Sequence, residues 1–289
     1  MPCGAAAWRP WKAASPPPKS MRIDRPASRR LSRRAALVGA GWCALSTLPL
    51  GAMGQSLPDL VARAKPSVVL VGTYRETDAP RFRFSGTGFV VGDGWTVVTN
   101  AHVLPDPSIP AEGRVVQVQA WRGERQWEAR PARVLTVARE RDLAVLRLEG
   151  GPALPALTLA EGPPPREGSE LAFIGFPIGG ALGFAHVTHR ALLSSITGLV
   201  LPQSSGQGLS PRAVRALRDG PMDIFQLDAT AYPGNSGGPV FDVASGQVVG
   251  VINMVLARGT RESALSQPTG ITYALPVALL HPLLKDLPR

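Results

Sequence analysis

Cysteine is nearly absent from this 289-residue chain, and both of its cysteines lie close to the N-terminus, at Cys3 and Cys43. If residues 1–54 are removed, as predicted below, the remaining chain has no disulfide, no cysteine nucleophile and no thiolate metal ligand. Histidine is also scarce, which leaves few candidates for a general base or a metal site. The four histidines are His102, His186, His189 and His281.

Aromatic residues are few as well, at 6% of the sequence, whereas there are 31 glycines and 29 prolines. This balance disfavours a helical bundle and is typical of a turn-rich, all-β protein. Charged residues make up 18% and hydrophobic residues 44%, so the chain is not disordered throughout. Its length suits one or two domains with a packed core.

The net charge of +10 is concentrated at one end of the chain. Residues 1–54 contain nine Lys or Arg and one Asp, whereas residues 55–289 contain twenty-two Lys or Arg and twenty Asp or Glu. The remainder therefore carries only +2. Because no nucleic-acid-binding motif accompanies the basic segment, we expect no nucleic-acid partner.

Residues 1–54 have the order of an export signal. Four arginines between Arg29 and Arg34 precede the uncharged apolar run Ala35–Leu50, and small residues at 52–54 provide a cleavage site. Ser32–Leu37 resembles a twin-arginine signal, with Ala36 where Phe is usual. We predict that this segment is removed and that the protein is exported, to the bacterial periplasm or beyond.

Other interpretations of this segment stay open. The general secretory route and an uncleaved membrane anchor are both alternatives, although a run of 16 residues is short for a membrane span of ~20. Translation could start at Met1 or Met21. We expect no stable membrane span after signal removal.

The rest of the chain predicts a β-sandwich or β-barrel. Eleven short β-branched or apolar runs alternate with Gly, Pro and Asp turns, and the Pro-rich stretch Gly150–Gly168 divides them into two sets. Short helices are expected between Ser56 and Pro66 and within 276–289. The long insertion 198–220 carries the signals of a small helix after Ser210.

Gly234–Pro239 (GNSGGP) is the strongest chemical motif. A serine nucleophile needs an exposed hydroxyl on a tight turn, with backbone amides aimed at the developing oxyanion, and flanking glycines permit such a turn. The motif predicts that Ser236 is a nucleophile. A plain hairpin turn is the alternative.

A serine at neutral pH requires a base, and the base requires an orienting carboxylate. His102 lies at the exit of an apolar strand, and Asp142 lies at the entry to another. We therefore expect these two to assist Ser236, and we expect the other three histidines to have packing or surface roles. A surface pair of Asp142 with Arg141 is the alternative for the carboxylate.

Three motifs, in this order, resemble those of the trypsin-like serine peptidases: TNAHV (99–103), RDLAVL (141–146) and PGNSGGPV (233–240). The particular residues of these motifs resemble the HtrA/Deg branch. The resemblance covers about residues 56–280. It implies two six-stranded antiparallel β-barrels, the first at about 66–150 and the second at about 169–280, with a linker at 151–168. Residues 55–289 would form this peptidase domain.

The resemblance also implies roles for individual residues. Ser236 would be the nucleophile, His102 the base and Asp142 its partner, with the amides of Gly234 and Ser236 as the oxyanion hole. The specificity pocket would include Thr230, Ile252 and Asn253.

Several expectations about substrates and regulation follow from the same resemblance. Because Thr230 stands where an Asp would select Lys or Arg, small or medium apolar side chains are expected in the pocket. Asn235 cannot pair with a new N-terminal amine, so no activating cleavage beyond signal removal is expected. We expect unfolded or flexible polypeptides as substrates, no cofactor and no metal. We expect no PDZ domain after Pro276, and a family-type trimer is in doubt.

The sequence leaves one other function class open and excludes another. A catalytically silent peptide-binding or chaperone-like module on the same fold is the alternative to an enzyme. An α/β-hydrolase esterase is excluded, because that fold requires the order Ser, Asp, His and alternating strands and helices.

Overall fold

The computed structural model describes residues 56–108, 111–124, 126–179, 183–199, 222–254 and 270–287. The predicted export signal and the predicted small helix after Ser210 lie outside these residues. Among the helices of the described ranges, none has the length and apolar character needed to cross a membrane.

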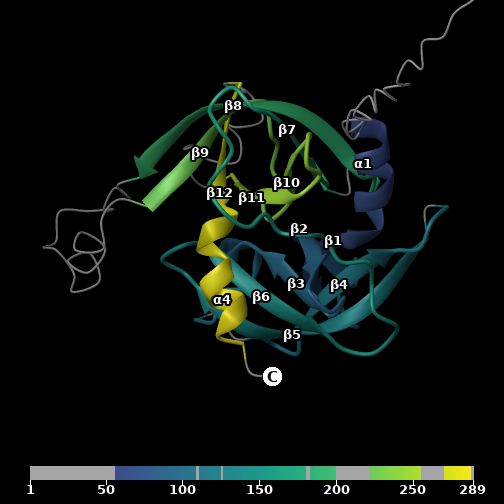
Figure 1. The fold of residues 1–289 in the computed structure, drawn as a ribbon. Coiled ribbons are helices and arrows are strands. Elements are labelled where there is room, and N and C mark those ends of the chain that lie inside the picture. Colours follow the sequence, from purple (N-terminus) through teal and green to yellow (C-terminus); the bar gives the residue numbers. More distant parts are fainter. Residues whose placement is uncertain are drawn as a thin grey trace, which may run out of the picture. The chain divides into compact units, whose positions relative to one another are not determined.

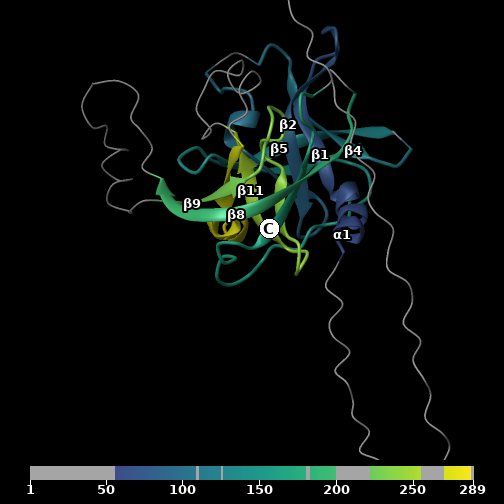
Figure 2. The ribbon, with the colours of Figure 1, turned by 90° about the horizontal axis from the view of Figure 1, so that it is seen from above.

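Twelve strands form two closed antiparallel barrels, which confirms the predicted all-β, two-barrel fold class (Figure 1). The strand order is β1-β2-β3-β6-β5-β4 in the first barrel and β10-β11-β12-β9-β8-β7 in the second. The first barrel comprises β1 (Val68–Tyr74), β2 (Phe82–Val91), β3 (Thr96–Thr99), β4 (Val115–Trp121), β5 (Trp127–Ala138) and β6 (Leu143–Leu148). The second comprises β7 (Glu170–Gly175), β8 (Val187–Leu199), β9 (Met222–Asp228), β10 (Pro239–Asp242), β11 (Val248–Asn253) and β12 (Ile271–Pro276). The far end of the β8–β9 ribbon extends beyond the second barrel in both views (Figures 1 and 2).

Strand β10 is the one that the apolar runs did not indicate. It has four residues, begins with a proline and follows the serine turn directly, so its pattern is too short to stand out. Val240 nevertheless pairs with Phe173 of β7 and Gly250 of β11, and this pairing closes the second barrel.

Several strands, β1 among them, are nearly continuous apolar runs because both of their faces are buried. In β1, Val69 and Val71 belong to the interior of the first barrel, whereas Val68 and Leu70 belong to a cluster that includes residues of both barrels. Successive side chains of a strand point to opposite faces, so one strand supplies both layers. We call the shared cluster the interface core. It includes Leu60, Val68, Leu70, Phe89, Val98, Ile174, Phe176, Phe241 and Leu275.

Short helices close the ends of the domain, as predicted. Helix α1 (Leu57–Ala64) begins where the Ser56 hydroxyl accepts a hydrogen bond from the Asp59 amide, and its buried residues include Leu60 and Ala64. The 3₁₀ turn η1 (Lys65–Ser67) leads into β1. At the other end, the 3₁₀ turn η3 (Val277–Leu279) precedes helix α4 (His281–Lys285).

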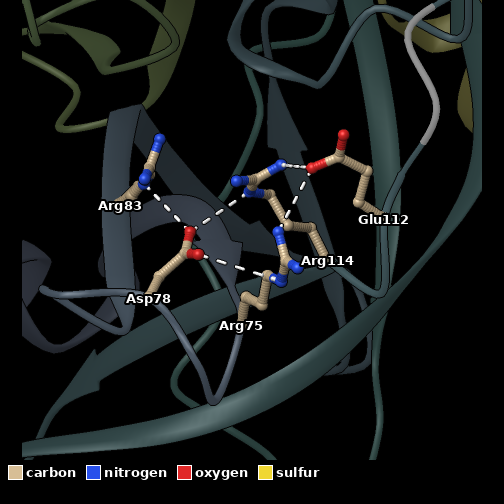
Figure 3. Close-up of polar contacts among 5 residues, drawn as sticks. All are labelled: Arg75, Asp78, Arg83, Glu112 and Arg114. Carbon is tan, nitrogen blue, oxygen red and sulfur yellow. Dashed lines mark hydrogen bonds and ion pairs between the residues drawn. The ribbon is translucent and has the colours of Figure 1, made fainter.

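An ion-pair network fastens the β1–β2 turn to the start of β4 (Figure 3). The Asp78 carboxylate, only 9% exposed, lies 3.1 Å from Arg83 Nε and 3.2 Å from Arg114 Nε. Arg75 and Arg114 each reach Glu112 Oε2 at 3.2 Å. Because several charges share partners at this rim, the network holds the two loops together better than isolated surface pairs would.

His186 fastens the second barrel to the first. Its Nε2 donates to the Val68 carbonyl at 2.9 Å, and its ring stacks on Trp127 of β5 with centroids 5.4 Å apart. The ring also lies 4.7 Å from that of Phe176. Burial lowers the pKa of His186 to about 4, so the imidazole is neutral at physiological pH.

Acidification is expected to destabilise the protein through His186. The unfolded chain binds a proton near pH 6.5, whereas the folded protein excludes it until about pH 4. The contribution is therefore complete above pH 6.5 and is lost as the pH falls through this window, by at most about 3 kcal/mol. Urea unfolding between pH 7 and 4 measures this loss.

The variant His186→Gln, which keeps an amide donor but does not titrate, is the control. It should show a smaller loss of unfolding free energy over the same pH range. The pKa of His189 is also lowered by burial, and its effect cancels in the comparison. An equal loss in both proteins would contradict the assignment to His186.

Candidate active site

The serine turn, residues 233–237, connects β9 to β10 and requires glycine at two places. Gly234 has φ +103° and Gly237 has φ +84°. A Cβ on Gly234 would lie 2.2 Å from the Phe176 carbonyl oxygen, and one on Gly237 would lie 2.1 Å from the Thr87 carbonyl oxygen. Backbone conformation and close packing therefore both exclude larger residues.

Four successive carbonyl groups of this turn each accept a hydrogen bond. Such anchoring fixes the orientation of each peptide plane, since the amide of a trans peptide points opposite to its carbonyl. The pairs are Ile178 N to Pro233 O at 2.8 Å, Thr87 Oγ1 to Gly234 O at 2.6 Å, Gly238 N to Asn235 O at 2.9 Å and Thr87 N to Ser236 O at 2.8 Å.

Two amides of the turn remain unused. The N–H groups of Gly234 and Ser236 donate to no other group in the described part of the chain. They belong to alternate residues of one tight turn that carries the Ser236 side chain. A negatively charged oxygen bound at that side chain would find two preformed donors there.

Strand β3 and the β5–β6 turn bring His102 and Asp142 together. His102 lies in the 3₁₀ turn η2 (Ala101–Val103), directly after β3. Its Nδ1 is 2.6 Å from Asp142 Oδ2, and its backbone N donates to Asp142 Oδ1 at 2.9 Å. The carboxylate thus fixes both the ring and the backbone of the histidine, and the alternative pairing with Arg141 is not what the structure shows.

Both barrels hold Asp142 in place. The residue has φ +50°, a left-handed conformation that Asp tolerates better than most residues. Its carbonyl accepts from the Asn100 side chain at 2.9 Å, and Asn253 Nδ2 of the second barrel donates to Oδ2 at 2.7 Å. Asn100 belongs to the TNAHV motif and Asn253 was expected in the specificity pocket, but sequence spacing alone did not show that both converge on one aspartate.

Ser236 is 4% exposed, and its hydroxyl oxygen accepts a hydrogen bond from the Met254 amide at 3.3 Å. The hydroxyl proton stays available to an acceptor such as an imidazole. Among the described residues the structure shows no direct hydrogen bond between His102 and this hydroxyl. Such bonds are often long in unliganded sites and tighten when a ligand binds.

The three residues expected to line a specificity pocket have different environments. Thr230 is half-buried, Ile252 is fully buried in the core of the second barrel, and Asn253 directs its amide to Asp142. Thr272, which sequence reasoning missed, anchors the segment around Thr230. Its hydroxyl donates to Ala229 O at 2.7 Å and accepts from Ala231 N at 3.0 Å.

The other three histidines pack against the fold. His186 contacts Val68, His189 stacks on Phe173 with centroids 4.5 Å apart, and His281 Nε2 lies 2.9 Å from Ala160 O. In the described ranges, no group of three His, Cys, Asp or Glu side chains is arranged to hold a metal ion.

Comparisons with known proteins find similar sequences and a similar structure. Residues 86–251 match the trypsin-like peptidase domain family. The chain is 26% identical over 225 residues to human serine protease HTRA3, covering 76% of this chain and 42% of that protein. It is 29% identical over 225 residues to zebrafish serine protease HTRA1A, with coverage of 76% and 39%. The crystal structure of the active form of the Rv3671c protease from M. tuberculosis matches with a TM-score of 0.56 and 26% identity, over 79% of this chain and 83% of that one.

These relatives are longer than the matched region. The chain spans about two fifths of the length of the curated relatives named above.

Replacing Gly234 by alanine is expected to destabilise the protein, because a Cβ there collides with a backbone oxygen. Gly162→Ala is a matched control, since Gly162 has φ +98° and nothing lies within 4 Å of its Cβ position. Both variants incur the strain of positive φ, and only Gly234→Ala adds the collision. Thermal unfolding should place Gly234→Ala below the control by about 1–3 kcal/mol. Equal losses would show that the turn has room to relax.

Proposed function

The chain belongs to the trypsin-like peptidase domain family, and on that premise we propose that it is a serine endopeptidase that hydrolyses peptide bonds in unfolded or flexible protein segments. An extended chain can bind beside the site by strand addition, which requires substrate segments without stable structure of their own. The reaction needs neither a metal nor a cofactor. We also propose that the protein acts after export, in the periplasm or outside the cell.

In this proposal, Ser236 Oγ attacks the substrate carbonyl while His102 accepts its proton. Asp142 orients the imidazole and stabilises its charged form through the 2.6 Å contact with Nδ1. The protonated imidazole then gives its proton to the leaving amine as the carbon–nitrogen bond breaks. Water, deprotonated by His102, releases the acyl group from Ser236 and restores the hydroxyl.

The observation that carries the proposal is the serine turn itself. Four tethered carbonyls and two unused amides, on Gly234 and Ser236, flank a single nucleophilic hydroxyl. The tetrahedral intermediate places its negative oxygen where those amides can donate, and such donors act without reorganisation during the reaction. A hairpin turn without a catalytic role does not require unused amides beside a serine hydroxyl.

Labelling with a fluorophosphonate tests the nucleophile. Purified protein spanning residues 55–289 should be labelled and should degrade casein, and Ser236→Ala should abolish both. Asp142→Asn should lower turnover by roughly 10⁴-fold, because the imidazole loses its orienting charge. A folded protein that resists labelling would favour the silent peptide-binding alternative instead.

Placing a charge at Thr230 tests the specificity pocket. Thr230→Asp should shift cleavage toward sites after Lys or Arg, because an acidic group beside the site attracts a cationic side chain. Mass spectrometry of casein digests measures the preference, and Thr230→Asn, which adds no charge, is the matched control. An unchanged preference in the Asp variant would place the pocket elsewhere.

A further inference from the structure

Thr87, on β2 of the first barrel, reaches across to the serine turn of the second. It is fully buried, and its hydroxyl donates to Gly234 O at 2.6 Å. Thr87 Oγ1 in turn accepts a hydrogen bond from the Phe176 amide at 3.2 Å, and the Thr87 amide donates to Ser236 O at 2.8 Å. One residue therefore contacts the turn through both its side chain and its backbone.

The Thr87 hydroxyl fixes the peptide plane that follows Gly234, because that plane carries the Gly234 carbonyl. The Thr87 amide fixes a later plane, which carries the Ser236 carbonyl. Ile178 fixes the plane that precedes Gly234, since its amide donates to Pro233 O at 2.8 Å. The plane held by Ile178 carries the Gly234 N–H, and it shares the Gly234 Cα with the plane held by the Thr87 hydroxyl. The plane that the Thr87 hydroxyl holds lies between the two planes that carry the Gly234 and Ser236 N–H groups. Its orientation therefore sets the angle between these two donors.

Ile178 shows that this arrangement is maintained against strain. It has φ +55°, which is a genuine outlier for a β-branched residue, and it is 39% exposed, so core packing does not explain the conformation. Strained backbone of this kind persists where the surrounding contacts over-determine it.

We propose that Thr87 is a positioning residue for the oxyanion hole. Its hydroxyl holds the Gly234 carbonyl and thereby keeps the Gly234 and Ser236 amides aimed at one point, the reacting oxygen. The proposal rests on the proposed function and adds a residue that touches no substrate. It links catalysis to the docking of the two barrels, because the anchor and the hole belong to different barrels.

The test uses Thr87→Val, which keeps the shape and removes the hydroxyl, beside Thr87→Ser, which keeps the hydroxyl. We expect Thr87→Val to lower kcat by roughly 10- to 100-fold with little change in KM, because misaimed donors weaken only the transition state. Hydrolysis of a fluorescence-quenched peptide, taken from a casein cleavage site, provides the assay. It is measured well below the melting temperature of each variant.

The affinity for a peptide boronic acid is a second measurement. It would not change if Thr87 had a purely structural role. The boronate adduct with Ser236 places an oxygen in the oxyanion hole, so Thr87→Val should weaken the boronate by a factor similar to the loss in kcat. Thr87→Ser should retain most of the wild-type kcat and most of the wild-type affinity for the boronate. If the valine variant fails to fold, Thr87→Ala removes the same hydroxyl and replaces it in the test.

A folded Thr87→Val variant with wild-type kcat would overturn the proposal. So would a Thr87→Ser variant as impaired as Thr87→Val, because packing would then be the cause. Failure of the proposed function is distinguishable, since wild-type protein would then show no Ser236-dependent hydrolysis.

Discussion

The hydrogen bond from the Thr87 amide to the Ser236 carbonyl joins the first barrel to the serine turn of the second, and the geometry of the site depends on that junction. A second bond crosses in the opposite direction, from Asn253 to the Asp142 carboxylate. Each barrel thus supplies a donor that positions a functional residue of the other. Neither barrel alone holds a complete site, so the relative placement of the barrels sets the distance between Ser236 and His102.

Apolar packing provides the rigidity that these polar contacts require. Strands such as β1 are buried on both faces, with one face in a barrel interior and the other in the interface core. His186 adds a polar contact at the same boundary through Val68, and its low pKa keeps it uncharged where a charge would be poorly solvated. Close-packed protein interiors resist small displacements, and a site divided between two barrels needs that resistance to keep its geometry.

Much of the fold could be predicted from the sequence, because eleven of twelve strands appear as apolar runs and the three motifs identify the family resemblance. Strand β10 was missed since four residues carry too little periodicity. At the site, the motif order singled out His102, Asp142 and Ser236, and the structure places the first two in contact. The hydroxyl of Thr87 and the amide of Asn253 could not be assigned from spacing, because their partners lie 147 and 111 residues away in the chain. Long-range partners of buried polar groups are fixed by topology, and local pattern does not encode them.

The support of the serine turn is almost entirely uncharged. Its carbonyls are held by backbone amides and one hydroxyl, and the residue before the serine is the fully buried Asn235, whose Oδ1 lacks a hydrogen-bond partner among the described residues. An aspartate at that position would demand a buried cation, because an unpaired carboxylate is costly to desolvate. Neutral tethers make no such demand, and their strength does not change with pH in the physiological range. The turn is therefore held in place by contacts that do not involve a new N-terminal amine. That no activating cleavage beyond signal removal is needed stays a prediction.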